Sequence, residues 1–237
     1  MSEQPAGWPA ERVARILADI QVAPSILSAD FGALREQVRD VLAAGARVIH
    51  VDVMDGHFVP PITVGPLVVS ALADDVREAG GMVEVHLMIE RPERHVGDFL
   101  AAGADSITIH AEATPHLAYA ANLIREQGAG VGVAINPGTA VGELAEVAQA
   151  IDLALCMTVN PGWGGQPFIE HSLAKLPRVR AIVGQGVAVE VDGGIDPRTG
   201  PRCLEAGASV FVAGSSIFGA PDPGQAYREI AASLAPA

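Results

Sequence analysis

One pattern recurs along the chain: a helix-like segment ends at a glycine, and a short run of β-branched residues follows. The pattern occurs at Ala44-Gly45, Ala79-Gly80, Ala102-Gly103, Gln127-Gly128, Gln185-Gly186 and Ala206-Gly207. Glycine is common just after a helix because it adopts the left-handed backbone conformation at little steric cost. The apolar runs that follow are typical of buried strands. Each repeat therefore predicts a helix followed by a strand.

Two further apolar runs, near Val22 and Leu153, bring the candidate strands to eight. The predicted strands start near residues 22, 48, 83, 107, 131, 153, 187 and 210, at intervals of 22 to 35 residues. Each interval has room for one strand, one helix and two loops. Eight such units predict a single α/β domain, a (β/α)8 TIM barrel. The alternative is a doubly wound open sheet, which more often has about five to seven units.

The length of 237 residues suits one such barrel. Residues 1–20 precede the first strand, and we expect them to form an N-terminal helical extension. A helix over Glu11–Ile20 would cover the bottom of the barrel, and residues 21–237 would form the catalytic barrel. The chain is 49% apolar and 18% charged, so it can bury a large core and does not resemble a disordered chain.

The charged residues limit the possible partners. Asp and Glu outnumber Lys and Arg by 28 to 15, and the net charge of −13 argues against a nucleic-acid surface. The sequence contains no apolar run long enough to span a membrane and no secretory signal at its start. Its two cysteines, Cys156 and Cys203, are far apart, so we expect a cytoplasmic protein. The single lysine, Lys175, is interpreted as a surface residue, which disfavours chemistry that needs an active-site lysine.

Side chains alternate along a strand, so residues two apart share a face. In the second, third and seventh predicted strands one face is wholly apolar and suits packing against helices. The opposite faces therefore point into the barrel. These inward residues are His50, Asp52, Met54, Glu84, His86, Met88, Glu190 and Asp192.

Some of these inward side chains are suited to bind a metal ion, namely His50, Asp52, His86 and Asp192. A single histidine or aspartate at a strand end is more often a core or capping residue, but four on one face favour a metal site. Imidazole with carboxylate suits one divalent ion of Zn, Fe(II), Mn or Co better than Ca or Mg. We interpret Glu84 and Glu190 as partners that orient these ligands.

Glycine-rich loops follow the last three predicted strands, at Asn160–Gln166, Asp192–Gly194 and Ala213–Ser216. Loops after strands 7 and 8 of such barrels often bind a phosphate through backbone N–H groups. A tight turn would explain any one of these loops, but three in succession favour a phosphate site. No G-x-G-x-x-G motif follows the first strand, so a nucleotide cofactor is not indicated.

Three methionines, Met54, Met88 and Met157, face inward near the mouth of the barrel, as core filling or as an apolar collar over a substrate. His110 ends the fourth strand and is a candidate for lining the mouth. The remaining histidines fall in loops or at helix starts and are predicted to be solvated: His57, His95, His116 and His171.

These motifs together resemble the ribulose-phosphate 3-epimerase family. The resemblance covers residues 22–219, and its motifs occur in the family's order. The most specific motif is HVDVMDGHFVP at 50–60. The others are APSILSADF at 23–31, VHLM at 85–88, NPGWGGQ at 160–166, EVDGG at 190–194 and AGS at 213–215.

The resemblance implies roles for individual residues. It makes His50, Asp52, His86 and Asp192 the ligands of one divalent metal ion, and Asp52 and Asp192 also the catalytic acid and base. It further implies a set of substrate-binding residues, several of them in loops that contact the phosphate: Ser25, Met54, His86, Met88, Met157, Gly162, Trp163, Gly164, Gly165, Gly193, Gly194, Gly214 and Ser215.

The implied reaction belongs to the pentose phosphate pathway and interconverts D-ribulose 5-phosphate and D-xylulose 5-phosphate by inverting C3. Two alternatives are a 3-epimerase of a ketohexose 6-phosphate such as allulose 6-phosphate, and a non-catalytic phosphosugar-binding barrel. Gly164 favours the pentose, because the hexose relatives carry alanine there. Related barrel lyases and decarboxylases need an Asp-x-Lys-x-x-Asp strand, whereas the stretch Asp52–Asp55 has no lysine. Because barrels of this kind often associate, we expect a homo-oligomer.

The sequence departs from the family pattern at four places. Pro61 stands where Asn is usual, which removes an amide side chain and a backbone donor from the loop after the second strand. Glu84 replaces the usual Asp, and Trp163 replaces the usual Phe. The segment before the first strand is longer than is typical. We expect Pro61 to affect loop closure and Trp163 to affect the fit of the substrate.

Overall fold

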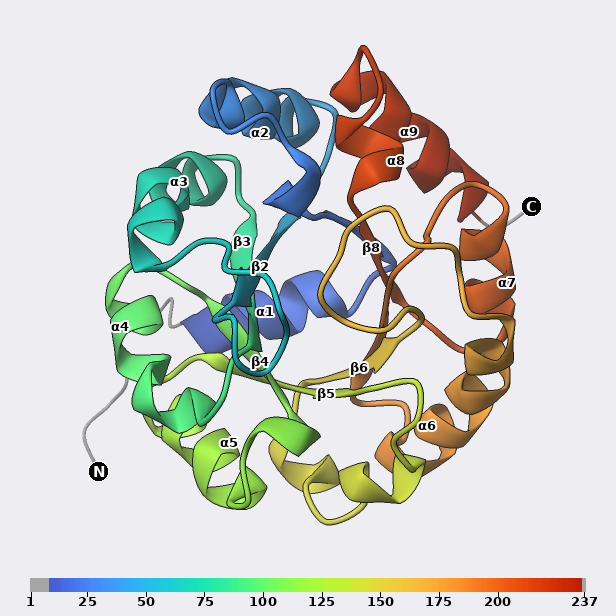
Figure 1. Cartoon of the computed structure of the whole chain (residues 1–237). Helices are drawn as coiled ribbons and strands as arrows, with labels where there is room; N and C mark the ends of the chain where they lie inside the picture. The colour runs from blue at the N-terminus through green and yellow to red at the C-terminus, as the bar shows by residue number, and fades with distance from the viewer. Residues whose placement is uncertain (1–8, 236–237) are drawn as a thin grey trace.

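The computed structural model describes residues 9–235, in which eight parallel strands form a barrel inside a ring of helices (Figure 1). The strands are β1 (Gln21–Pro24), β2 (Val48–Met54), β3 (Met82–Met88), β4 (Ser106–His110), β5 (Gly130–Ile135), β6 (Leu153–Met157), β7 (Ala188–Asp192) and β8 (Val210–Ala213). Each starts within one residue of its predicted position, so the predicted barrel is confirmed.

The strands pair in the order β1-β8-β7-β6-β5-β4-β3-β2. Between β1 and β2 the barrel is closed by a single bridge, Ser25 with His50. The open doubly wound sheet is therefore wrong for this chain. All strands run in the same direction, so their C-terminal ends meet at one mouth.

The helices that follow the strands cover the outside of the barrel. They are α2 (Leu34–Ala43), α3 (Pro66–Glu78), α4 (Val96–Ala101), α5 (Leu117–Glu126), α6 (Leu176–Val183), α7 (Thr199–Glu205), α8 (Ser215–Phe218) and α9 (Pro223–Ser233). Short 3-10 helices lie in the loops: η1 (Ile26–Ser28), η2 (Pro92–Arg94), η3 (Ala111–Ala113), η4 (Val141–Leu144), η5 (Ala148–Ala150) and η6 (Glu170–Lys175). Only η4 and η5 connect β5 to β6, so this unit has 3-10 turns in place of a longer helix.

The recurring glycines end helices as the sequence predicts, with one change. Five of the six have φ between +76° and +117°. The exception precedes β7, where α6 already ends at Gly184, which has φ +76°. Gly186 is not among the residues with positive φ.

Two buried apolar layers separate the outside of the strands from the inside. Ile49, Val51 and Val53 of β2 belong to the outer layer, which packs against the surrounding helices. Met82 and Leu155 belong to the inner layer. This division confirms the predicted alternation, because His50 and Asp52 of β2 then face the barrel interior.

A helix before β1, α1 (Pro9–Leu17), lies across the bottom of the barrel and is visible through its centre in Figure 1. Val13 is fully buried there. It packs so closely against Gly130, at the start of β5, that a Cβ on this glycine would lie 2.7 Å from Cγ1 of Val13. Arg12 pairs with the buried carboxylate of Asp105. The helix begins and ends earlier than the predicted Glu11–Ile20.

Residues 1–8 of the predicted extension lie outside the described residues, and the division at residue 20 stays a prediction. None of the helices within residues 9–235 has the length and apolar character needed to span a membrane.

Candidate active site

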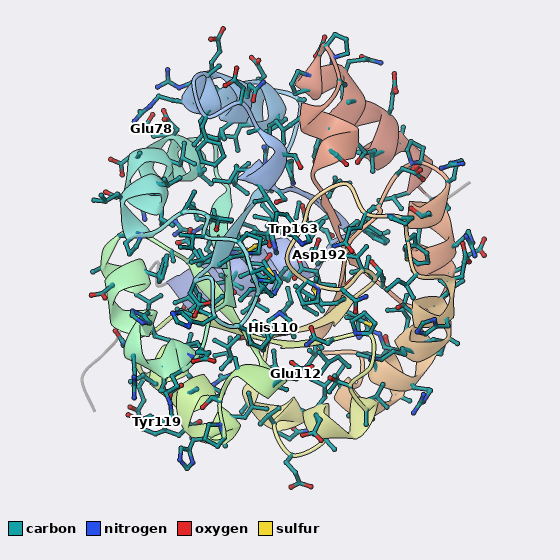
Figure 2. All side chains as sticks on the ribbon, in the orientation of Figure 1. Glu78, His110, Glu112, Tyr119, Trp163 and Asp192 are labelled. Carbon is teal, nitrogen blue, oxygen red and sulfur yellow. The ribbon has the colours of Figure 1, made fainter. Side chains whose placement is uncertain are left out.

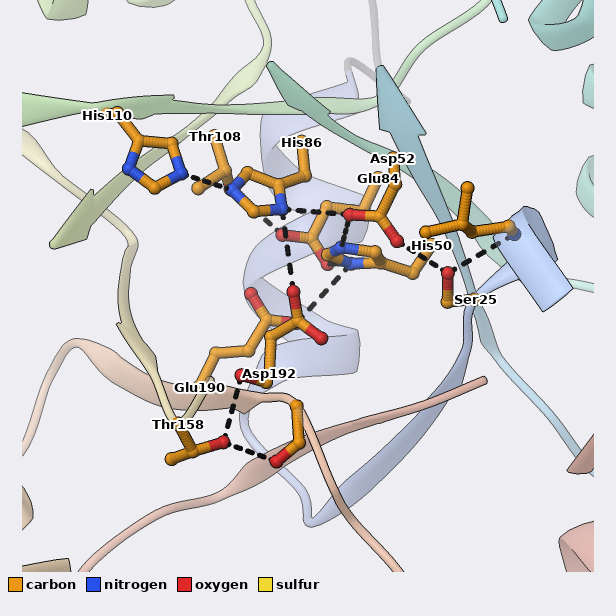
Figure 3. Close-up of polar contacts among 12 residues, drawn as sticks. Ser25, His50, Asp52, Glu84, His86, Thr108, His110, Thr158, Glu190 and Asp192 are labelled. Carbon is orange, nitrogen blue, oxygen red and sulfur yellow. Dashed lines mark hydrogen bonds and ion pairs between the residues drawn. The ribbon is translucent and has the colours of Figure 1, made fainter. Parts of the chain in front are cut away.

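Two neighbouring strands and one more distant strand bring four predicted residues together. In the β2–β3 register Asp52 lies opposite His86, while Asp192 ends β7. Asp52 Oδ1 lies 3.0 Å from His86 Nδ1 and 3.3 Å from His50 Nε2. Asp192 Oδ2 lies 3.7 Å from His86 Nδ1. Figure 3 shows these side chains pointing toward one another.

The chemistry of this cluster suits a cation. One ligand atom from each of His50, Asp52, His86 and Asp192 lies within 4.8 Å of the others. Nε2 of His50 is buried and has no hydrogen-bond partner. Buried nitrogen and oxygen atoms whose lone pairs point at one another are costly unless a proton or a cation lies between them. The cluster is therefore able to hold a metal ion.

The two aspartates of the cluster have opposite preferences for a proton. Burial alone would raise the pKa of Asp52, but His50 and His86 beside it hold that pKa well below its usual range. The Ser25 hydroxyl also donates a hydrogen bond of 2.5 Å to Asp52 Oδ2. Burial and the negative charge of Asp52 raise the pKa of Asp192 to about 8. One site thus contains a carboxylate and a carboxylic acid near neutral pH, which is the pairing that acid–base catalysis needs.

Two glutamates lie deeper in the barrel. Glu84 Oε2 is 3.2 Å from His50 Nδ1, and Glu84 Oε1 accepts a hydrogen bond of 2.9 Å from Thr108. Glu190 comes within 3.7 Å of the same His50 nitrogen, but its oxygens have no hydrogen-bond partner. Burial and the nearby Glu84 raise the pKa of Glu190 well above its usual value. The geometry suits Glu84 as the residue that orients His50, whereas Glu190 makes no such hydrogen bond.

A cavity opens above the cluster at the C-terminal ends of the strands. It encloses about 560 Å³ of space, part of which is open solvent at its mouth. Asp52 and Asp192 line it, together with twelve of the predicted substrate-binding residues: Ser25, Met54, Met88, Met157, Gly162, Trp163, Gly164, Gly165, Gly193, Gly194, Gly214 and Ser215. His86 is the exception, because it is fully buried below the cavity floor.

Two glycines of the loops at the cavity wall, Gly194 and Gly165, have similar backbone conformations but different surroundings. Gly194 has φ +68°, and a Cβ there would lie 2.7 Å from the backbone nitrogen of Phe168. Gly165 has a similar φ of +72° but open space around it. Both positions need the left-handed conformation, and Gly194 also needs the absence of a side chain.

Sequence reasoning missed several residues of the cavity wall. Ser28 lines the cavity, and its Oγ would lie 2.8 Å from a Cβ on Gly214. Gln166 lines it as well, and its side-chain amide donates to the carbonyls of Asn160 and Trp163 at 2.6 and 2.9 Å. Ser28 lies within the APSILSADF motif and Gln166 within the NPGWGGQ motif, so position in a motif was the available signal.

Trp163 and Pro61, where the sequence departs from the family pattern, occupy the loops at the mouth. Trp163 is 63% exposed at the cavity rim, which Figure 2 shows near Asp192. A Cβ on Gly162 would lie 3.8 Å from the Pro61 ring. The loops after β2 and β6 therefore meet at Pro61 and Gly162.

His110 is tied to the cluster and does not line the cavity. Its Nε2 lies 2.8 Å from Nε2 of His86, and its Nδ1 lies 3.2 Å from Glu112 Oε2. Burial lowers the pKa of His110 to about 4. Burial alone would raise the pKa of Glu112, but hydrogen bonds from His110 and Thr139 lower it to about 2. A neutral imidazole next to a carboxylate results.

The prediction that Lys175 is a surface residue is wrong. Lys175 is buried, and its ammonium group donates hydrogen bonds to the carbonyls of Asn136, Pro137 and Thr139, at 2.8, 3.2 and 2.8 Å. These carbonyls belong to the loop after β5. The helical pattern of the sequence around Lys175 does not indicate a contact with that loop. The other histidine predictions are confirmed, because four side chains are exposed: His57, His95, His116 and His171.

The parallel barrel, the buried His and Asp cluster and the glycine loops together define a (β/α)8-barrel enzyme with its site at the C-terminal ends of the strands. Comparison with known proteins identifies the family. The model of the ribulose-phosphate 3 epimerase family matches residues 21–218. The chain therefore belongs to the ribulose-phosphate 3-epimerase family, a family of isomerases, and the resemblance seen in the motifs is confirmed.

Individual relatives agree with this assignment. Ribulose-phosphate 3-epimerase of Bacillus subtilis is 49% identical over 219 residues, 90% of this chain and 99% of the relative. Chloroplastic ribulose-5-phosphate-3-epimerase of Arabidopsis thaliana is 49% identical over 226 residues, 93% of this chain and 79% of the relative. A solved structure of 3-hexulose-6-phosphate synthase has a TM-score of 0.68 at 24% identity, covering 92% of this chain and 100% of the synthase, and shares the fold.

Proposed function

We propose that this protein interconverts D-ribulose 5-phosphate and D-xylulose 5-phosphate by inverting the configuration at C3, with Asp52 and Asp192 as acid and base. The observation that carries the proposal is the pair of aspartates at one cavity floor, whose pKa values are shifted in opposite directions. Family membership supports the choice of substrate, because the relatives are named for this reaction.

The positions of the two aspartates suit an inversion. The C3 hydrogen lies next to the C2 ketone, so a base can remove it when the negative charge that develops is stabilised. Asp52 comes from β2 and Asp192 from β7, so the two carboxyl groups approach a sugar between them from different sides of the barrel. In one direction the ionised Asp52 takes the proton and the protonated Asp192 delivers one to the opposite face. The roles exchange in the reverse direction.

We further propose that His50, Asp52, His86 and Asp192 hold one divalent ion, Zn, Fe(II), Mn or Co. The unpartnered Nε2 of His50 supports this, and imidazole with carboxylate suits these ions. When bound, the ion would stabilise the negative charge that develops on the sugar oxygens next to C3.

The upper part of the cavity suits the rest of the substrate. Met54, Met88 and Met157 present apolar surface beside the aspartates, and the glycine loops after β6, β7 and β8 present backbone to a phosphate. The one lysine of the chain, Lys175, is occupied by three backbone carbonyls and does not line the cavity. That arrangement counts against the lysine-dependent lyases and decarboxylases of similar fold.

We also propose that the protein works in the cytoplasm as a homo-oligomer without a nucleic-acid partner. Its free, buried cysteines support a cytoplasmic location. Its net charge of −13 supports the absence of a nucleic-acid partner. Exposed apolar side chains of Phe31, Ile62 and Leu67 support self-association. Light scattering at several protein concentrations tests the oligomeric state, and a monomer at all of them would contradict it.

Steady-state kinetics on aspartate variants test the proposed reaction. Asp52→Asn and Asp192→Asn should each lower kcat by about 100- to 10,000-fold, the usual worth of a positioned acid or base. Asp98→Asn, at an exposed position on α4, is the matched control and should keep wild-type activity. Near-normal turnover in either active-site variant would contradict the two-aspartate scheme.

Substrate comparison separates the remaining alternatives. We expect kcat/KM to be higher for ribulose 5-phosphate than for allulose 6-phosphate. A preference for allulose 6-phosphate would assign the protein to the hexose reaction. Calorimetric binding of both sugars without any turnover would assign it to a binding role.

A further inference from the structure

One of the proposed metal ligands, His86, contacts a second buried histidine, His110. What we infer from this pair rests on the proposed function. His86 and His110 are both fully buried, and their Nε2 atoms lie 2.8 Å apart. The two ring planes are within 20° of each other. A contact of this length between two imidazole nitrogens requires that one donates a proton and the other accepts it.

Glu112 determines which nitrogen of His110 carries the proton. Its Oε1 accepts hydrogen bonds from the Thr139 hydroxyl and from the backbone N–H of Asn136, the latter at 2.8 Å. Its Oε2 lies 3.2 Å from Nδ1 of His110. An ionised carboxylate can only accept, so Nδ1 of His110 must donate.

The loop after β5 holds Glu112 in this position. Lys175 donates to the Asn136 and Thr139 carbonyls at 2.8 Å each, and so fixes the two residues that donate to Glu112. His110 also packs against Phe58, with ring centroids 4.9 Å apart. The orientation of His110 is therefore set by packing and by hydrogen bonds from elements outside the cavity.

We propose that His110 and Glu112 are positioning residues that keep the proton of His86 on Nε2 and its Nδ1 lone pair directed at the metal site. With Nδ1 of His110 donating to Glu112, the neutral ring accepts from His86 through Nε2. His86 then has its proton on Nε2, and its Nδ1, which lies 3.0 Å from Asp52 Oδ1 and 3.7 Å from Asp192 Oδ2, would direct a lone pair at an ion held between these groups. Figure 3 shows His110 on the side of His86 that faces away from Asp52. A hydrogen bond to the outer nitrogen of a metal-binding histidine fixes its tautomer and raises its basicity.

Imidazole nitrogen NMR of the Zn²⁺-loaded wild-type protein reads the proton positions directly. We expect a proton on Nε2 of His86 and on Nδ1 of His110. A proton on Nε2 of His110 would overturn the proposal, because that nitrogen could then not accept a hydrogen bond from His86. This measurement does not depend on any variant folding.

Variants of His110 test the consequence for metal affinity, with Co²⁺ as the probe added to chelator-treated protein. His110→Phe keeps the ring shape but removes the acceptor, and should weaken Co²⁺ binding by about 10- to 100-fold. His110→Gln places an amide oxygen near the original Nε2 and should recover most of that loss. His116→Phe, the same change at an exposed histidine, should leave Co²⁺ affinity unchanged.

The same titration distinguishes this inference from the proposed function. If the wild type binds Co²⁺ and His110→Phe binds it equally well with the same absorption spectrum, the positioning role is wrong while the metal site stands. If the wild-type protein does not bind Co²⁺, the proposed metal site is wrong and the positioning role falls with it.

Discussion

Replacing Asp192 by asparagine should stabilise the metal-free protein, and increasingly so as the pH rises. The carboxyl group titrates near its usual value of 3.8 when unfolded, whereas burial and the charge of Asp52 raise its pKa to about 8 in the folded state. Between these values the folded protein holds a proton that the unfolded chain has lost. The free energy of unfolding of the wild type therefore falls as the pH rises through this window.

The size of the effect follows from the same shift. One proton of difference changes the free energy of unfolding by at most about 1.4 kcal/mol per pH unit. From pH 5 to pH 7.5 the advantage of Asp192→Asn should therefore grow by up to about 3 kcal/mol, and by less where Asp52 and its neighbours share the titration. The side chain of Asp192 approaches His86 only to 3.7 Å, which is beyond hydrogen-bond distance, so asparagine would lose no hydrogen bond to that ring.

Urea unfolding in the presence of a chelator measures this difference at several pH values. Asp196→Asn is a suitable control: burial alone would raise the pKa of Asp196, but hydrogen bonds from Thr199 and Arg198 lower it, so its substitution should not become more favourable as the pH rises. Adding Zn²⁺ should stabilise the wild type more than Asp192→Asn, because only the wild type keeps all four ligands. A difference between Asp192→Asn and wild type that does not change from pH 5 to pH 7.5 would refute this reasoning.

Three further predictions test the supporting structure, each by urea or thermal unfolding. Lys175→Met leaves three carbonyls without their charged donor and should cost about 2–3 kcal/mol, whereas an unchanged stability would contradict the buried role of Lys175. Gly194→Ala should cost about 1–3 kcal/mol more than Gly165→Ala, because the two glycines have similar φ and only Gly194 faces the Phe168 backbone; equal costs would contradict that contact. Arg12→Met should lower stability by leaving the buried Asp105 carboxylate without its cation, and no loss would argue against this ion pair between α1 and the residue just before β4.

The sequence was sufficient to predict the strands and their faces for a physical reason. Glycine after a helix and alternation along a strand are local properties, so each of the eight strands could be placed within one residue of its observed start. The inward orientation of His50, Asp52 and His86 followed from the same alternation. Once the strands were in order, the four residues of the cluster had to meet at the mouth.

Contacts that depend on register or on a distant loop could not be predicted in the same way. The link between His86 and His110 depends on the β3–β4 register, which aligns His86 with Thr108. Alternation gives the face of each residue but not this alignment. Lys175 was misplaced because its partners are carbonyls about forty positions earlier in the chain, in the loop after β5.

Deuterium incorporation at C3 of the sugar tests the central claim most directly. In deuterium oxide, NMR should show the wild-type protein converting ribulose 5-phosphate to xylulose 5-phosphate with deuterium entering at C3. Chelator treatment should abolish this exchange and added metal should restore it, while Asp192→Asn should remain inactive with metal present. Undiminished C3 exchange after complete removal of metal, or formation of xylulose 5-phosphate by the Asp192→Asn protein at the wild-type rate, would contradict the account.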